Sequence, residues 1–174
     1  MLNKNIVLIG FSGCGKTTIG RRLARIRGME FADTDVILEA EAGMPITKIF
    51  ENFGEDYFRG LETETIKKTA SAGGRVIATG GGCVKNEKNM RLLADNGVIV
   101  YLKCSASKIF ENVKHDTTRP LLNTDDKLKR IEEMLEQRRE LYEKYAQLTV
   151  DISDDGLWDA VKKADAAVAL HFHE

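Results

Sequence analysis

The sequence contains few of the features that mark secreted, membrane-bound or disordered proteins. Only 2 prolines and 3 cysteines occur among its 174 residues, and the cysteines form no CxxC pair. No uninterrupted apolar run approaches the ~20 residues that a membrane span needs, and the first residues lack the apolar segment of a signal peptide. Three cysteines, an odd number without CxxC spacing, are typical of a protein from a reducing compartment. We therefore expect a cytoplasmic protein that does not bind a membrane.

The sequence also lacks an excess of charge of either sign. Lys and Arg total 26 and Asp and Glu total 27, which gives a formal net charge of −1. Proteins that bind nucleic acid usually carry a clear basic excess, so we expect no nucleic-acid partner. Apolar residues make up 43%, enough to bury a sizeable core. The length fits one domain of ~150 residues, so we expect residues 1–174 to form a single domain.

Short apolar runs alternate with segments of helical periodicity. Strands are predicted over residues 5–9, 30–33, 75–79, 97–102 and 148–152. Helices are predicted over residues 17–28, 36–42, 45–52, 55–70, 87–95, 106–113, 125–146 and 156–168. Parallel strands need crossover connections, so this pattern predicts an α/β fold of three layers, with a five-stranded parallel sheet between helices. Residues 114–124 interrupt the pattern, and we expect them to form a mobile segment.

The strongest motif is the glycine-rich sequence GFSGCGKT at residues 10–17, called the phosphate loop below. It matches G-x-x-x-x-G-K-[ST] in full and lies between a predicted strand and a predicted helix. Backbone N–H groups and the helix N-terminus bind phosphates in such a loop. Lys16 is expected to reach the β- and γ-phosphates, and the Thr17 hydroxyl to help hold Mg²⁺. The motif predicts a nucleoside triphosphate site formed by Gly13, Cys14, Gly15, Lys16, Thr17 and Thr18. Cys14 is either a small filler residue or a thiol with a redox role.

Two carboxylates follow the second predicted strand. Asp33 and Asp35 are two residues apart, and alternation along a strand would place them on the same side. One would hold the metal through water, while the other orients or deprotonates an attacking hydroxyl group. Aspartate is also a common helix N-cap, and Thr34 or Asp35 would cap a helix that begins at Val36. The neighbouring phosphate loop favours the functional interpretation.

Three consecutive glycines, Gly80, Gly81 and Gly82, follow the third predicted strand and are called the triple glycine below. Ligands of open α/β sheets bind outside the carboxyl ends of the strands. Glycines at this edge expose backbone donors and leave room for a ligand. The triple glycine therefore indicates a pocket for a small polar molecule.

Three arginines stand out in the sequence. Arg138 lies on the apolar face of its predicted helix, where it either extends to solvent, joins a structural ion pair or meets a buried anion. Arg59 precedes Glu62 by three residues, the spacing of an ion pair on a helix surface. Arg119 lies within residues 114–124, where an arginine on a lid would stabilise the transferring phosphoryl group.

In combination, these motifs resemble the shikimate kinase family. The resemblance covers about residues 5–168 and rests on the phosphate loop followed by DTD (33–35), FRGLE (58–62), GGG (80–82), RPLL (119–122) and RRELY (138–142). It implies a P-loop kinase fold like that of nucleoside monophosphate kinases, and phosphorylation of the 3-hydroxyl of shikimate by ATP. Two other hypotheses stay open at this point: a kinase for another acceptor, such as gluconate or a nucleoside monophosphate, and a non-enzymatic module that binds ATP.

The resemblance also implies roles for individual residues. Asp35 would bind the substrate hydroxyls and act as the base, while Arg59, steadied by Glu62, and Arg138 would hold the substrate carboxylate. The triple glycine would line the substrate pocket beside Phe50 and Phe58. Lys16 and Arg119 would contact the phosphates of ATP, and Thr17 and Asp33 would help to bind Mg²⁺. Residues 35–62 would form a substrate-binding region, residues 114–124 a lid, and residues 169–174 a C-terminal tail.

Two positions depart from the family pattern. Asn112 stands where some members carry an arginine that stacks on adenine. The loop at residues 153–155, Ser-Asp-Asp, is acidic rather than basic. Both departures concern contacts with the adenine base and leave the residues of phosphoryl transfer intact. No apolar helix face is left over in the pattern, so we expect a monomer.

Overall fold

The computed structural model describes residues 4–116, 122 and 124–172. Its strands form one parallel sheet of five, in the order β2-β3-β1-β4-β5. The strands are β1 (Asn5–Ile9), β2 (Glu30–Asp33), β3 (Arg75–Ala78), β4 (Gly97–Lys103) and β5 (Leu148–Asp151). Each strand lies within one residue of its predicted bounds, which confirms the parallel sheet expected from the sequence.

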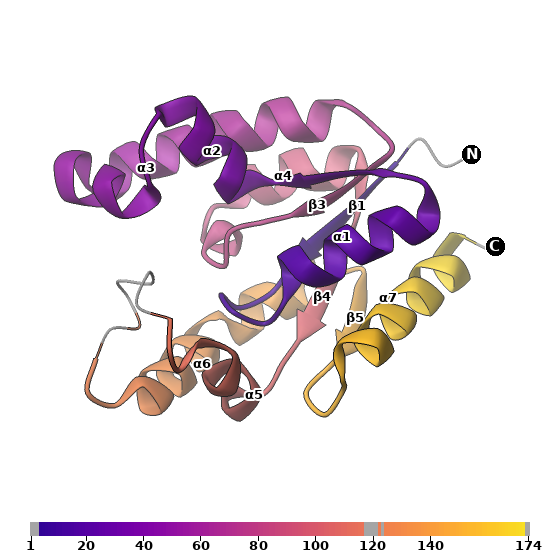
Figure 1. Cartoon of the computed structure of the whole chain (residues 1–174). Helices are drawn as coiled ribbons and strands as arrows, with labels where there is room; N and C mark the ends of the chain where they lie inside the picture. Colours follow the sequence, from indigo (N-terminus) through magenta and orange to yellow (C-terminus); the bar gives the residue numbers. More distant parts are fainter. Residues whose placement is uncertain (1–3, 117–121, 123, 173–174) are drawn as a thin grey trace.

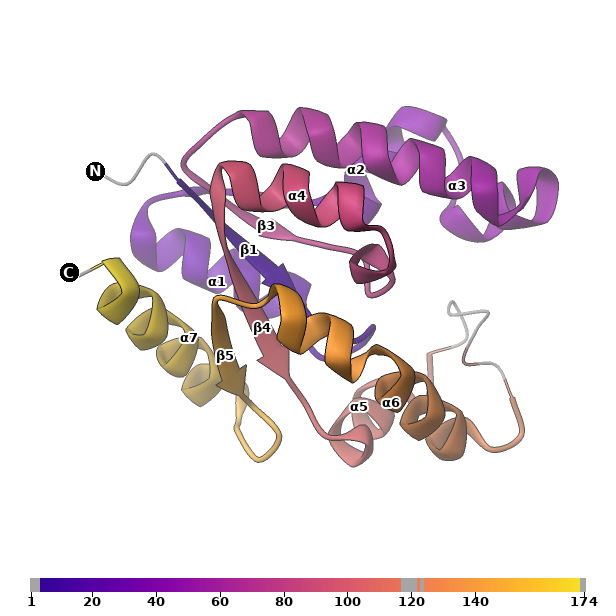
Figure 2. The ribbon, with the colours of Figure 1, turned by 180° about the vertical axis from the view of Figure 1, so that it is seen from behind.

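Helices cover both faces of this sheet (Figures 1 and 2). On one face α1 (Lys16–Arg27) and α7 (Leu157–Phe172) share a core with Ile6 and Leu8 of β1. On the other face α4 (Glu87–Asp95) and the second half of α3 (Ile46–Ser71) share a core with Val7 and Ile9. Alternate residues of one strand thus enter opposite cores, as a parallel strand buried on both faces requires. The three-layer α/β architecture is confirmed.

Four further elements belong to the described part of the chain. They are α2 (Thr34–Ala42), the 3₁₀ turn η1 (Cys83–Lys85), α5 (Ala106–Val113) and α6 (Lys127–Tyr145). The long α3 is broken at Gly54, whose φ of 81° and ψ of 177° are not helical. This break matches the two helices that the sequence predicts on either side of residues 53 and 54. Leu38, Ile49 and Phe58 form a small separate core that joins α2 to α3.

Two expectations about the chain need correction. The helix after β2 begins at Thr34, so Asp33 itself is the N-cap, and neither Thr34 nor Asp35 has that role. Strand alternation therefore does not relate Asp33 to Asp35, because Asp35 lies in the first turn of α2. The predicted C-terminal tail is also wrong for residues 169–172, because α7 continues to Phe172.

The expected lid, at residues 114–124, lies largely outside the described residues, and so does Arg119. Within the described part of the chain, no helix has both the length and the apolar character needed to cross a bilayer.

Candidate active site

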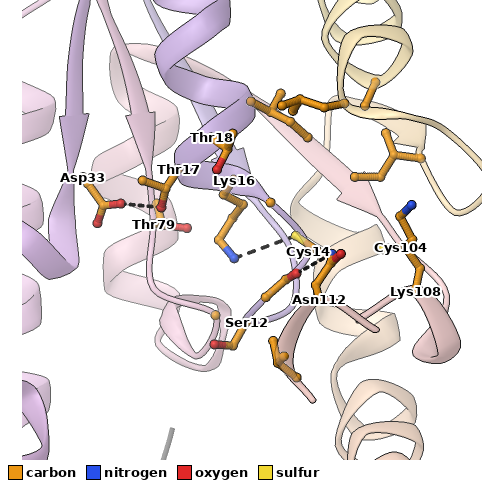
Figure 3. Close-up of a pocket in the computed structure, with 18 of the residues that line it drawn as sticks. Ser12, Cys14, Lys16, Thr17, Thr18, Asp33, Thr79, Cys104, Lys108 and Asn112 are labelled. Carbon is orange, nitrogen blue, oxygen red and sulfur yellow. Dashed lines mark hydrogen bonds between the residues drawn. The ribbon is translucent and has the colours of Figure 1, made fainter. Parts of the chain in front are cut away.

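The phosphate loop connects the end of β1 to the start of α1 and borders a cleft of about 650 Å³ (Figure 3). Gly13 and Gly15 have φ values of 86° and 104°, a backbone conformation that residues with a side chain rarely adopt. Lys16 is only 7% exposed, and its Nζ donates to the carbonyl oxygens of Gly10 and Phe11 at 2.8 and 2.9 Å. The lysine amine is thus held over the loop, beside the N-terminus of α1. Six of the seven predicted nucleotide-binding residues line the cleft, and the seventh, Arg119, lies outside the described residues: the six are Gly13, Cys14, Gly15, Lys16, Thr17 and Thr18.

Thr17 and Asp33 meet at the same end of the cleft. The Thr17 hydroxyl donates to Oδ2 of Asp33 at 2.7 Å. The other carboxylate oxygen, Oδ1, accepts from the backbone N–H groups of Asp35 and Val36 at 3.1 and 3.4 Å, which caps α2. One oxygen of Asp33 thus caps α2, and the other is paired with Thr17 at the end of the cleft.

This pair suits a magnesium ion that is shared with phosphates. Mg²⁺ typically takes one or two protein oxygens, keeps several waters and takes its other ligands from the substrate. Among the described residues, no three His, Cys, Asp or Glu side chains are grouped to hold a metal on their own. A hydroxyl and one carboxylate beside a phosphate loop therefore fit a metal that arrives with the nucleotide.

The far end of the cleft is built by α5 and the start of α7. Asn112, on α5, donates from Nδ2 to the carbonyl oxygen of Gly13 at 2.9 Å, which ties this helix to the phosphate loop. Across the cleft, Asp155 pairs with Lys163 through an Nζ–Oδ2 contact at 2.7 Å. Lys163 therefore neutralises part of the negative charge of the acidic loop at residues 153–155. Cys14 is buried, and this burial favours its interpretation as a filler residue.

Asp35 is the most perturbed carboxyl group of the site. Burial, together with the nearby charges of Asp33, Glu62 and Glu39, raises its pKa to about 6, although Lys16 opposes the shift. Asp35 also lines the cleft with Lys16. A carboxylate with a raised pKa at a triphosphate site is suited to accept a proton near neutral pH.

The triple glycine is the point where the parts of the site converge. A Cβ on Gly80 would lie 2.8 Å from Oδ1 of Asp35. A Cβ on Gly81 would lie 2.7 Å from the backbone nitrogen of Ser12 in the phosphate loop, and one on Gly82 would lie 2.9 Å from NH2 of Arg59. The absence of side chains here lets a carboxylate, the phosphate loop and a guanidinium approach one stretch of backbone.

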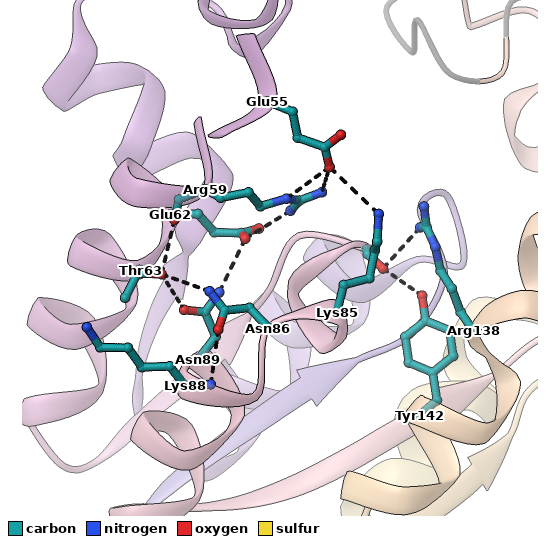
Figure 4. A network of polar contacts seen from close by, with 11 residues as sticks. Glu55, Arg59, Glu62, Thr63, Lys85, Asn86, Lys88, Asn89, Arg138 and Tyr142 are labelled. Atoms are coloured by element: carbon teal, nitrogen blue, oxygen red, sulfur yellow. Dashed lines mark hydrogen bonds and ion pairs between the residues drawn. The ribbon is translucent and has the colours of Figure 1, made fainter. Parts of the chain in front are cut away.

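Arg59 is fixed by two glutamates of its own helix (Figure 4). Its NH1 contacts Oε2 of Glu62 at 2.9 Å, and its Nε and NH2 contact Oε1 of Glu55 at 3.3 and 3.1 Å. Glu62 is only 2% exposed and also accepts from Nδ2 of Asn89 at 3.2 Å. Burial raises the pKa of Glu62, while Arg59 and Asn89 act against the shift. The predicted Arg59–Glu62 pair is therefore present, and it is mostly buried rather than a surface pair.

Arg138 approaches the triple glycine from α6. It is 9% exposed, and its NH1 donates to the carbonyl oxygen of Gly81 at 3.2 Å. The Tyr142 hydroxyl donates to the same oxygen at 2.7 Å, and the guanidinium lies 5.6 Å from the ring centre of Phe11. Of the three sequence interpretations, an inward arginine placed to meet an anion agrees best with this environment.

Some residues of the site carry no role in the sequence analysis. Tyr142 anchors Gly81, Asn89 supports Glu62, and Asn112 anchors the phosphate loop. Glu55 precedes Arg59 by four residues, which is the spacing of a helical ion pair and a usable signal. The contacts of Asn89 and Asn112 join segments far apart in the chain, and a single sequence carries no signal for them.

This edge of the sheet combines a phosphate loop, a basic carboxylate beside it, and two guanidinium groups at the triple glycine. These features define a P-loop phosphotransferase whose acceptor is a small anionic molecule.

Comparison with known proteins gives the family. The family model for shikimate kinase matches residues 12–166. A shikimate kinase of Caldanaerobacter subterraneus is 46% identical over 151 residues, covering 87% of this chain and 88% of its own. One of Thermodesulfovibrio yellowstonii is 48% identical over 141 residues, covering 81% and 82% of the two chains. A solved structure of shikimate kinase from Acinetobacter baumannii in complex with shikimate has a TM-score of 0.90 at 34% identity, covering 98% of this chain and 93% of its own. The chain belongs to the shikimate kinase family.

Proposed function

We propose that this protein transfers the γ-phosphoryl group of ATP to the 3-hydroxyl of shikimate, giving shikimate 3-phosphate and ADP. The observation that carries the proposal is the convergence of Asp35, Arg59 and the phosphate loop on the triple glycine. A carboxylated ring with several hydroxyl groups needs guanidinium groups for its carboxylate and a carboxylate for its hydroxyls. Family membership supports ATP as the phosphoryl donor.

On the donor side, the phosphate loop binds the triphosphate through its backbone N–H groups. Lys16 supplies the positive charge on this side of the site. Its Nζ, which donates to the carbonyls of Gly10 and Phe11, would exchange these neutral acceptors for charged phosphate oxygens. Thr17 and Asp33 would hold Mg²⁺, which neutralises charge on the β- and γ-phosphates when it is bound.

On the acceptor side, Arg59 and Arg138 would hold the substrate carboxylate, with Glu62 keeping Arg59 in place. Asp35 would orient the 3-hydroxyl and accept its proton as the oxygen attacks the γ-phosphorus. Its pKa of about 6 leaves it ionised at neutral pH and more basic than an ordinary aspartate. The protein thus acts mainly by positioning the two reactants and by stabilising charge.

Several further features belong to this proposal. Residues 35–62 would form the substrate-binding region of a single domain. Residues 114–124 would form a lid that brings Arg119 to the transferring phosphoryl group. Cytoplasmic location, magnesium dependence and a monomeric state remain predictions.

The test is ADP release from Mg²⁺-ATP with shikimate, gluconate, AMP or no acceptor. We expect strong stimulation by shikimate alone. Lys16→Met and Asp35→Asn should lower this turnover by at least about 100-fold. Asp95→Asn, which changes an exposed aspartate at the end of α4, should not. Stimulation by another acceptor alone would refute the assigned substrate, and ATP binding without turnover on any acceptor would favour a binding module.

A further inference from the structure

The guanidinium of Arg59 is already paired with carboxylates on two sides. Glu62 takes NH1, while a single oxygen of Glu55, Oε1, contacts both Nε and NH2. The Nε–NH2 edge is one of the two edges through which arginine binds a carboxylate with paired hydrogen bonds. A substrate carboxylate that pairs with Arg59 must therefore displace one of these two glutamates or share its edge.

The two glutamates differ in how firmly they are held. Glu62 is 2% exposed, lies 2.9 Å from Arg59 and also accepts from Asn89. Glu55 is 54% exposed, and its contacts with Arg59 are 3.1 and 3.3 Å long. Removing Glu62 from Arg59 would leave a buried carboxylate without its cation, which is costly, whereas Glu55 would enter water. Glu55 is therefore the carboxylate that the substrate carboxylate displaces from Arg59.

A second cation stands beside Glu55. Nζ of Lys85, in η1 directly after the triple glycine, lies 3.7 Å from the same Oε1 that contacts Arg59 (Figure 4). Arg59 and Lys85 together hold the pKa of Glu55 below its ordinary value. Lys85 is half exposed and its side chain is long, so it can follow Glu55 when this residue leaves Arg59.

We propose that Glu55 is a displaceable carboxylate. Before substrate binds it pairs with the Nε–NH2 edge of Arg59, and when the substrate carboxylate takes this edge, Glu55 moves away and pairs with Lys85. This inference rests on the proposed function, because it takes Arg59 as a holder of the shikimate carboxylate. Glu55 keeps the guanidinium oriented and paired before binding.

The exchange predicts opposite effects for its two residues. Glu55→Gln removes the competing charge, so KM for shikimate should fall by about three-fold, the scale of an exposed ion pair. Lys85→Gln removes the receiving cation, so KM should rise by about two- to three-fold. Both effects should appear in KM, with kcat changing by less than about two-fold. In the double variant KM should equal that of Glu55→Gln, because Lys85 acts only through Glu55.

Two controls make the experiment specific. Glu87→Gln removes a similar exposed glutamate on α4, outside residues 35–62, which pairs with Arg91 at 2.7 Å, and should leave KM unchanged. With the neutral methyl ester of shikimate as acceptor, Glu55→Gln should not lower KM, because the ester presents no carboxylate to Arg59.

A rise or no change of KM in Glu55→Gln would overturn the exchange and make Glu55 a simple support of Arg59. A Lys85→Gln effect that persists in the Glu55→Gln background would overturn the role of Lys85, because Lys85 would then contact the substrate directly. Failure of the proposed function looks different: wild-type enzyme would show no turnover that depends on shikimate.

Discussion

The backbone of Gly80 and the carboxylate of Asp35 are so close that a Cβ on Gly80 would lie 2.8 Å from Oδ1. Gly80→Ala must therefore displace Asp35 or the start of the triple glycine. A displacement on the order of 1 Å in a reacting group costs about 100-fold in rate. We expect kcat for shikimate-dependent ADP release to fall by about this factor.

Gly60→Ala is the matched control for this substitution. Gly60 lies in α3, and a Cβ at this position would have no neighbouring atom within 4 Å, so an alanine fits there without a clash. Alanine favours a helix over glycine by about 1 kcal/mol, so this variant should be slightly more stable and fully active. Equal kcat values for the two alanine variants would contradict the constraint that Gly80 places on Asp35.

The raised pKa of Asp35 predicts the acid limb of the pH–rate profile. The base must be ionised to accept the proton of the acceptor hydroxyl, and the Asp35 carboxyl has a pKa of about 6. We expect kcat/KM for shikimate to be constant above about pH 7 and to fall about ten-fold per pH unit well below 6. The residual activity of Asp35→Asn should lack this limb. A profile that stays flat down to about pH 5 would exclude Asp35 as the base.

The same pKa shift means that ionised Asp35 destabilises the fold. The pKa rises from 3.8 to about 6 on folding, so the native state holds the proton more tightly than the unfolded state. Between these pH values stability is lost as the pH rises, and above the folded pKa the full cost of about 3 kcal/mol is present. Asp35→Asn should therefore raise the free energy of unfolding by about 3 kcal/mol at about pH 7.5 while it removes activity.

Denaturant unfolding at several pH values measures this effect. The gain of Asp35→Asn over wild type should shrink as the pH falls through about 6 and should be absent below 3.8. Asp56→Asn, at an exposed position, should show no such pH-dependent gain. A variant that is less stable than wild type at neutral pH would show that Asp35 has a structural role that outweighs its burial.

Much of this site could be predicted because its chemistry lies in short, contiguous motifs. The phosphate loop needs its glycines, Lys16 and Thr17 at fixed spacing. The triple glycine marks the place where other groups of the site approach the backbone closely. Arg59 and Glu62 are one helical turn apart, so their pairing follows from local geometry. The strands are equally clear, because a strand buried on both faces requires a short apolar run.

The parts that sequence reasoning missed depend on contacts between distant segments or on exact helix ends. Strand alternation gave the wrong reason for pairing Asp33 with Asp35, because Asp33 ends the strand and caps α2. The burial of Arg138 against the carbonyl of Gly81 joins residues 57 positions apart. A periodic pattern showed that Arg138 faces inward but could not show which group it meets.

Asn112 shows how this chain treats a position that departs from the family pattern. Its Nδ2 donates to the carbonyl oxygen of Gly13 at 2.9 Å, so it stabilises the phosphate loop. Asn112→Leu removes the donor and should raise Kd for ATP by about three-fold, whereas Asn112→Asp also places a charge near the carbonyl and the triphosphate and should raise it by about ten-fold. Titration calorimetry with Mg²⁺-ATP measures both values.

Glu111→Gln is the control for these Asn112 variants, because Glu111 is exposed on the same helix and pairs with Lys114 at 2.7 Å. This variant should bind ATP with wild-type affinity. KM for shikimate should stay unchanged in all three variants, since Asn112 contacts the donor half of the site. An Asn112→Leu variant with unchanged ATP affinity would show that the loop keeps its phosphate-binding shape without this hydrogen bond, through its glycines and Lys16 alone.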